Sequence, residues 1–145
     1  MNHIYSDSPA IILKDLLQGS PEQLKRICER IRRDKGLGRG TTAKLSALFG
    51  DRATRALEAV RRRKVKRYMY LPSGRERWVV VGRSKEYMVL PDAEYCTCED
   101  FYFQVVNGIV PHCYHILAQK IAEALKGYDL ICEDDSMYEF LSKEW

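Results

Sequence analysis

The 145-residue sequence lacks the features of several large protein classes. It has no apolar run near the roughly 18 residues that a membrane-spanning helix needs. Its first residues lack the basic and then apolar segments of a secretory signal. It has only three histidines, and no Ser/His/Asp set and no glycine loop ending in a phosphate-binding lysine is recognisable. The sequence therefore predicts a cytoplasmic protein, nuclear if the source is a eukaryote, that is not an enzyme and takes no small-molecule substrate.

A disulfide framework is also disfavoured. The five cysteines are odd in number, and three of them lie between positions 96 and 113. Cysteines grouped in this way fit metal binding in a reducing compartment. Cys28 lies on the apolar face of an expected helix, and Cys132 precedes a short helix near the C-terminus, so both are expected to be small buried residues.

Those three cysteines form two tight pairs with a histidine. Cys-x-Cys is followed, after fourteen residues, by Cys-x-His. Three thiolates and one imidazole fill the four positions of a tetrahedral Zn²⁺ and leave none for a reactive water. The sequence thus predicts one structural zinc ion bound by Cys96, Cys98, Cys113 and His115. The alternatives are four unrelated core or disulfide residues, or His112 as the imidazole ligand, although adjacent residues rarely point at the same ion.

This spacing resembles the SWIM-type zinc finger. The resemblance implies that the four residues act as zinc ligands in a small binding module. The spacer is long enough for a helical turn and a loop.

Charge is distributed unevenly behind a net charge of +4. Positions 24–67 hold sixteen Lys/Arg and four Asp/Glu, whereas positions 91–145 hold three and eleven. Such asymmetry suggests two faces with different partners, and the basic part would suit DNA. The candidate phosphate contacts are Arg61, Arg62, Arg63, Lys64, Lys66 and Arg67. Alternatively, these residues are solvated side chains at the C-terminal end of a helix, where cations are favoured, and have no binding role.

Apolar spacing predicts an α+β fold: N-terminal helices, then a small antiparallel β-meander and a zinc-clamped C-terminal helix. Ser8-Pro9 and Ser20-Pro21 are helix starts. From Val65 the apolar period changes from helical to alternating, with short turns between strands. We therefore predict a helical, basic part over residues 1–63. The meander, the zinc finger and the C-terminal helices follow over 64–145, and the two parts could form one compact domain.

A short amphipathic helix is expected at the C-terminus. Its apolar stripe, which consists of Met137, Phe140, Leu141 and Trp145, must dock somewhere, because so short a helix is marginal alone. It could contact a partner protein or this chain's own core.

A closer resemblance covers about residues 45–125. The segments that carry it are Leu45-Ser46-Ala47-Leu48-Phe49-Gly50, Ala53-Thr54-Arg55-Ala56-Leu57, Pro72-Ser73-Gly74-Arg75 and Tyr95-Cys96. They resemble the small SWIM-domain subunit of Shu-type complexes. That resemblance implies a non-enzymatic partner of a RecA-family recombinase paralogue in homologous-recombination repair. A free-standing DNA-binding zinc-finger protein, of the transcriptional-regulator type, is the alternative.

Overall fold

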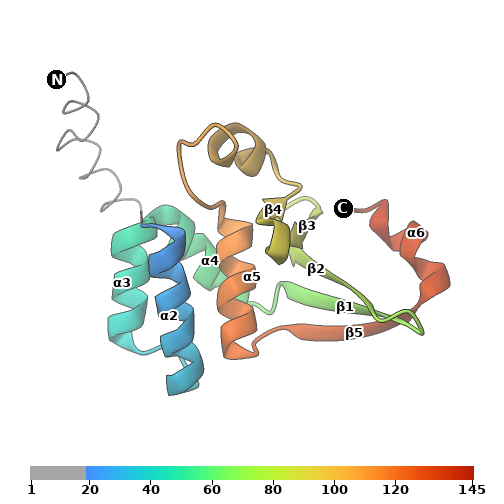
Figure 1. The fold of residues 1–145 in the computed structure, drawn as a ribbon, viewed down its shortest axis with the longest axis horizontal. Coiled ribbons are helices and arrows are strands. Elements are labelled where there is room, and N and C mark those ends of the chain that lie inside the picture. Colours follow the sequence, from blue (N-terminus) through green and yellow to red (C-terminus); the bar gives the residue numbers. More distant parts are fainter. Residues whose placement is uncertain (1–18) are drawn as a thin grey trace, which may run out of the picture.

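The computed structural model describes residues 19–145, so the predicted helix start at Ser8 and Pro9 lies outside the described residues. Within residues 19–145, three helices precede a five-stranded sheet, and a further helix lies between the fourth and fifth strands (Figure 1). The helices are α2 (Pro21–Asp34), α3 (Arg39–Phe49), α4 (Asp51–Arg61), α5 (Tyr114–Leu125) and α6 (Tyr138–Ser142). The strands are β1 (Val65–Leu71), β2 (Arg75–Val81), β3 (Glu86–Leu90), β4 (Tyr95–Cys96) and β5 (Asp129–Asp134).

Helix α2 shows how local sequence determines these elements. The Ser20 hydroxyl accepts a hydrogen bond from the Gln23 amide at 3.2 Å, and Pro21 occupies the first helical position. Both features were predicted, and they satisfy or remove amide donors that a helix start leaves free. The helix buries Leu24, Ile27, Cys28 and Ile31 on one face. Cys28 is thus a core residue, as expected.

The sheet has the strand order β4-β3-β2-β1-β5. Strands β1 to β4 form the predicted antiparallel meander. Strand β5 was not predicted; it pairs parallel to β1 and makes the sheet mixed. It is an edge strand of alternating exposure, and three of its six residues are acidic. Cys132 lies in this strand and is exposed, so the expectation that it is buried was wrong.

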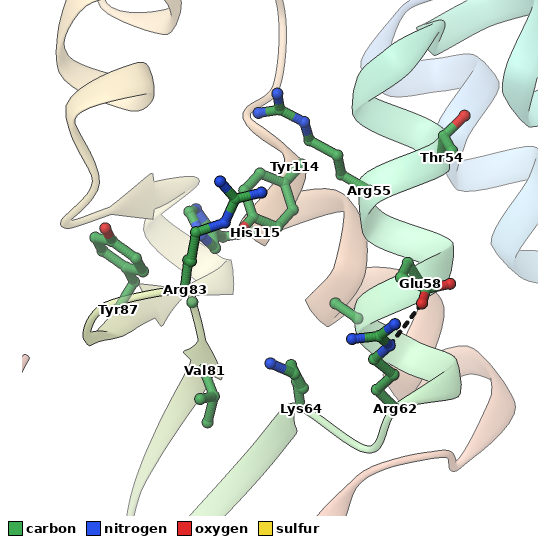
Figure 2. A pocket seen from close by; sticks show the side chains of 12 residues that line it. Thr54, Arg55, Glu58, Arg62, Lys64, Val81, Arg83, Tyr87, Tyr114 and His115 are labelled. Carbon is green, nitrogen blue, oxygen red and sulfur yellow. Dashed lines mark ion pairs between the residues drawn. The ribbon is translucent and has the colours of Figure 1, made fainter.

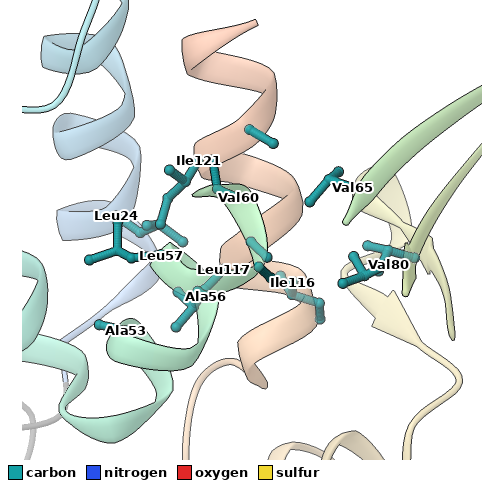
Figure 3. Packing of buried hydrophobic residues seen from close by; sticks show 14 of the residues in the cluster. Leu24, Ala53, Ala56, Leu57, Val60, Val65, Val80, Ile116, Leu117 and Ile121 are labelled. Atoms are coloured by element: carbon teal, nitrogen blue, oxygen red, sulfur yellow. The ribbon is translucent and has the colours of Figure 1, made fainter. Parts of the chain in front are cut away.

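The main core lies between the helices and one face of the sheet (Figure 3). It joins Leu57 and Val60 of α4 to Val65 and Val80 of the sheet and to Ile116 of α5. One continuous core therefore crosses the boundary expected near residue 63.

The opposite face of the sheet carries a smaller cluster. It consists of Tyr68, Tyr70 and Val79, and it is covered by side chains from the C-terminal segment. No helix within residues 19–145 is long and apolar enough to cross a membrane.

Candidate metal centre

The four predicted zinc ligands meet in space. Cys96 ends β4, Cys98 lies two residues beyond, Cys113 immediately precedes α5, and His115 is in its first turn. Their ligand atoms all lie within 4.8 Å of one another, and all four residues are buried. Tetrahedral Zn–S and Zn–N bonds place ligand atoms about 3.6–3.8 Å apart. The cluster is therefore close to the size that a zinc ion requires, and zinc would join the sheet edge to α5.

Backbone hydrogen bonds hold the Cys-x-Cys turn in place. Between its cysteines, Thr97 binds Met88 of β3 twice: its amide donates to the Met88 carbonyl at 3.1 Å, and its hydroxyl accepts from the Met88 amide at 3.0 Å. The Phe101 amide donates to the Cys98 sulfur at 3.2 Å. Such a donor favours the thiolate form that binds metal.

The imidazole of His115 also fits a metal ligand. It is 3% exposed, and neither ring nitrogen has a hydrogen-bond partner among the described residues. The ring lies between Tyr87 and Tyr114, with centroid distances of 4.4 and 3.8 Å. Buried polar atoms almost always have a partner, and a cation held by the three thiolates would supply it.

The thiols of the cluster shift one another's pKa values through mutual hydrogen bonds. Hydrogen bonds from the Cys113 and Cys96 thiols lower the pKa of Cys98. Hydrogen bonding to Cys113 and Cys98 raises the pKa of Cys96, with burial acting in the same direction. A divalent ion would displace the remaining protons, as metal binding to cysteine does generally.

His112, the competing imidazole, is not part of this cluster. It is 2% exposed, and its ring lies edge-on to Phe49 with a centroid distance of 5.9 Å. Burial lowers the pKa of His112 to about 4. The imidazole is therefore neutral at physiological pH.

The segment between the two ligand pairs, residues 99–112, forms a loop that projects from the sheet and helices (Figure 1). We call it the zinc loop. The predicted short helix is present as one π-helical stretch, Phe101–Val105. Arg52 of α4 anchors the loop through two hydrogen bonds to Asp100, at 3.1 and 2.8 Å. The loop exposes large apolar side chains, namely Tyr102, Phe103, Val106 and Ile109.

The predicted DNA-contacting segment is largely engaged in ion pairs. Arg61 and Arg62 both pair with Glu58, at 3.7 and 2.6 Å. Arg63 pairs with Asp129 at 2.9 Å, which ties the end of α4 to the start of β5. The carboxylates of Glu58 and Asp129 therefore neutralise much of the positive charge of the three arginines.

The remaining residues of that segment separate as the chain enters β1. Lys66 pairs with Glu86 at 3.3 Å, and Arg67 pairs with Glu76 while its guanidinium lies over the Trp78 ring. Lys64 instead lines a groove beside His115. The structure therefore does not bring the six cations together as one surface, because strand alternation turns successive side chains to opposite faces.

The groove contains basic residues that the sequence reasoning missed. Arg55 of α4 and Arg83 of the β2–β3 turn line it together with Arg62 and Lys64. No linear motif connects these positions, which lie on separate elements.

The C-terminal stripe is divided by the fold. Leu141 and Trp145 pack on the smaller cluster of the chain's own sheet, and the Trp145 indole donates to Glu86 at 3.0 Å. Met137 and Phe140 are exposed, at 36% and 64%. Trp145 therefore packs on this chain's own sheet, whereas Phe140 stays exposed.

No protein-family profile matches the chain. Among curated proteins, it is 31% identical over 101 residues to a zinc finger SWIM domain-containing protein 7 homolog of Dictyostelium discoideum, covering 68% of this chain and 65% of the relative. It is 36% identical over 86 residues to zinc finger SWIM domain-containing protein 7 of Homo sapiens, covering 57% and 59%. An uncharacterized protein of Archaeoglobus fulgidus is 40% identical over 83 residues, covering 57% and 64%.

The cluster of three cysteines and one histidine, together with these relatives, defines the class: the chain is a SWIM-domain zinc-binding protein. Within that class it is similar to zinc finger SWIM domain-containing protein 7, which confirms the resemblance drawn from the motif. The chain spans about three-fifths of the length of the curated relatives it matches.

Proposed function

We propose that this protein is a non-enzymatic accessory factor of homologous-recombination DNA repair that partners a RecA-family recombinase paralogue. The observation that carries the proposal is its SWIM zinc-finger class, combined with the resemblance of residues 45–125 to the small subunit of Shu-type complexes. In this role the protein binds a single zinc ion and takes no small-molecule substrate. It acts in the cytoplasm, or in the nucleus if the source is a eukaryote.

The chemistry of the metal centre supports a structural role for zinc. Four buried protein ligands would fill the four positions of a tetrahedral zinc ion, and none would remain for a substrate or an activated water. The ion would instead connect β4 to the start of α5. A rigid platform of this kind serves binding rather than catalysis.

The zinc loop supports the proposal of a protein partner. Tyr102, Phe103 and Val106 are 67%, 56% and 62% exposed, and Ile109 is 45% exposed. Contiguous exposed apolar side chains on a monomer usually mark an interaction site. The exposed carboxylates of Asp92 and Glu94 precede the loop in sequence and Glu99 begins it, so a partner with a basic rim would be steered toward it.

Co-expression with each RecA-family paralogue of the source organism tests the proposal. We expect a stable heteromeric complex by size-exclusion chromatography with light scattering. Phe103→Ser should weaken that complex, because an aromatic anchor at the centre of an interface contributes most of its energy. Leu130→Ser is the matched control, since Leu130 is 58% exposed on β5, away from the zinc loop.

Phe140→Ser shows in the same assay whether the exposed side of the C-terminal helix also contributes. Failure of every paralogue to form a complex would overturn the proposed function. Equal weakening by Phe103→Ser and Leu130→Ser would move the interface away from the zinc loop.

The second candidate is a free-standing DNA-binding regulator, and the basic groove beside the zinc centre favours it. A regulator binds DNA without a partner and prefers a particular sequence, because it must read base edges. Binding measured across unrelated oligonucleotides separates the two functions. A strong sequence preference would favour the regulator.

A further inference from the structure

A groove of about 650 Å³ lies beside the zinc centre. Its walls come from α4, the ends of β1 and β2, the β2–β3 turn and the first turn of α5 (Figure 2). His115 forms part of one wall, so the groove and the metal centre share a residue. Zinc would therefore keep this side of the groove in place, since it would hold the start of α5 against the sheet.

The lining of the groove is strongly cationic. It contains Arg55, Arg62, Lys64 and Arg83, and its single carboxylate is Glu58. Two of these cations form exposed ion pairs with carboxylates of α4: Arg62 pairs with Glu58 at 2.6 Å, and Arg55 pairs with Asp51 at 3.3 Å. Neither Lys64 nor Arg83 has an ion-pair partner within residues 19–145. The resulting positive potential within a hollow attracts anions more strongly than the same charges on a convex surface.

The cations are spread along the groove. In Figure 2, Arg62 and Lys64 lie near the end of α4, whereas the guanidinium groups of Arg55 and Arg83 lie near Tyr114. Two positive groups separated along one groove match a ligand that carries several linked phosphates.

An aromatic ring lies within this arrangement. Tyr114 is half-buried and lines the groove, and the Arg55 guanidinium is 6.0 Å from its ring centre. Grooves that combine a cationic track with aromatic rings bind single-stranded nucleic acids, because unpaired bases stack on the rings while the backbone follows the charges. A duplex keeps its bases paired inside and has no base to offer to Tyr114.

We propose that this groove binds the sugar-phosphate backbone of a single-stranded nucleic acid. Arg55 and Arg83 contact phosphates at one end of the groove, Arg62 and Lys64 contact phosphates at the other end, and Tyr114 stacks with a base. This inference goes beyond the proposed function, because it requires no protein partner. It also places the nucleic-acid contact at a site shared by α4, the start of β1, the β2–β3 turn and α5, in place of the continuous run of basic residues in the sequence.

The test uses the full zinc-loaded chain and a fluorescently labelled oligothymidylate of about 20 nucleotides, longer than one single-strand site. Anisotropy gives Kd as a function of salt. The variant Lys64→Gln/Arg83→Gln removes one cation from each group. Each lost phosphate contact reduces the salt slope by about 0.7 for a single strand, which is about fivefold in Kd near 0.1 M salt. We expect the slope to fall by about 1.4 and Kd to rise about twentyfold.

Arg26→Gln/Lys44→Gln is the matched control. It removes the same charges from exposed positions on α2 and α3 that do not line the groove. Its slope should stay within experimental error of the wild type. An equal loss in both double variants would overturn the proposal, since net charge and not the groove would then determine binding. Absence of measurable oligothymidylate binding by the wild-type chain would also overturn it.

Two further arms identify the source of the phosphates. A duplex of the same length should bind more weakly than the single strand, and free thymidine monophosphate should displace the oligonucleotide only at much higher concentration. Tighter binding of the duplex would refute the single-strand assignment. Displacement by the mononucleotide at equal phosphate concentration would instead assign the groove to a free nucleotide.

Discussion

Removing one zinc ligand is expected to unfold the protein on both sides of residue 63. The perturbation is Cys98→Ala, which leaves three ligands for the ion and removes the sulfur that accepts the Phe101 amide. Structural zinc in small fingers contributes roughly 10–16 kcal/mol of apparent binding free energy at neutral pH. A whole domain is usually stable by only about 5–15 kcal/mol. Loss of the ion therefore costs about as much free energy as folding provides.

The structure explains why this loss would spread to the N-terminal helices. Cys113 and His115 connect the ion to the start of α5, and α5 is the element on which both parts of the chain pack (Figure 3). Leu117 and Ile121 of α5 are fully buried in the same cluster as Leu24 of α2. A displaced α5 would expose this shared core, so α2 cannot stay folded independently.

The assay combines zinc content by elemental analysis with hydrogen exchange followed by mass spectrometry. In Cys98→Ala we expect peptides from α2 to lose protection together with those from β4 and α5. Cys132→Ser is the control, because Cys132 is an exposed cysteine outside the cluster. It should keep one equivalent of zinc and full protection.

Two results would refute this reasoning. A folded Cys98→Ala protein would show that the apolar core suffices without the metal centre. Loss of protection in β4 and α5, with α2 unchanged, would show that residues 19–63 form an independent unit. Carefully purified wild-type protein with well below one equivalent of zinc would contradict the metal assignment itself.

Three further substitutions test individual contacts through the free energy of unfolding in urea. Arg52→Lys should lower the free energy of unfolding by about 1 kcal/mol, because lysine cannot reproduce the paired hydrogen bonds to the half-buried Asp100. Arg55→Lys is the control and should cost less, because Arg55 pairs with Asp51 in an exposed ion pair. Tyr70→Phe should leave stability unchanged or raise it by about 1 kcal/mol, because the Tyr70 hydroxyl is buried without a partner among the described residues and burial raises its pKa to about 12. Trp145→Ala should cost about 2 kcal/mol, because the indole packs on the sheet and donates to Glu86.

Each of these substitutions has an outcome that contradicts its argument. Equal costs for Arg52→Lys and Arg55→Lys would mean that the zinc loop does not depend on its anchor. A marked loss of stability in Tyr70→Phe would reveal a hydrogen bond to the hydroxyl, for instance through a bound water. If Trp145→Ala leaves the free energy of unfolding unchanged, the packing of Trp145 on the sheet does not stabilise this chain, and Trp145 becomes a candidate partner contact again.

The metal centre was accessible to sequence reasoning because its geometry is local within each half. Cys96 and Cys98 share one turn, and Cys113 and His115 share the start of one helix, so spacing alone places each pair correctly. The start of α2 was predictable for the same reason, since Ser20 and Gln23 are three residues apart. The strands of the meander followed from alternation and short turns.

Tertiary structure alone decided the features that depend on distant residues. Strand β5 pairs with β1 some sixty residues earlier, and a parallel pairing leaves no turn signal in the sequence. Arg63 looked free in the sequence, yet it meets Asp129 across a separation of 66 residues. Ion pairs of this kind determine which positive charges remain available, and no count of arginines could anticipate them.

The groove and the C-terminal docking site have the same origin. Arg55, Lys64 and Arg83 belong to a helix, a strand entry and a turn, and only packing around α5 brings them to one hollow. The apolar stripe predicted that the last helix packs against another surface. The helical spacing of apolar residues does not identify that surface. The fold decided that Trp145 lies on the chain's own sheet, because the tyrosine cluster on that face would otherwise be exposed to water.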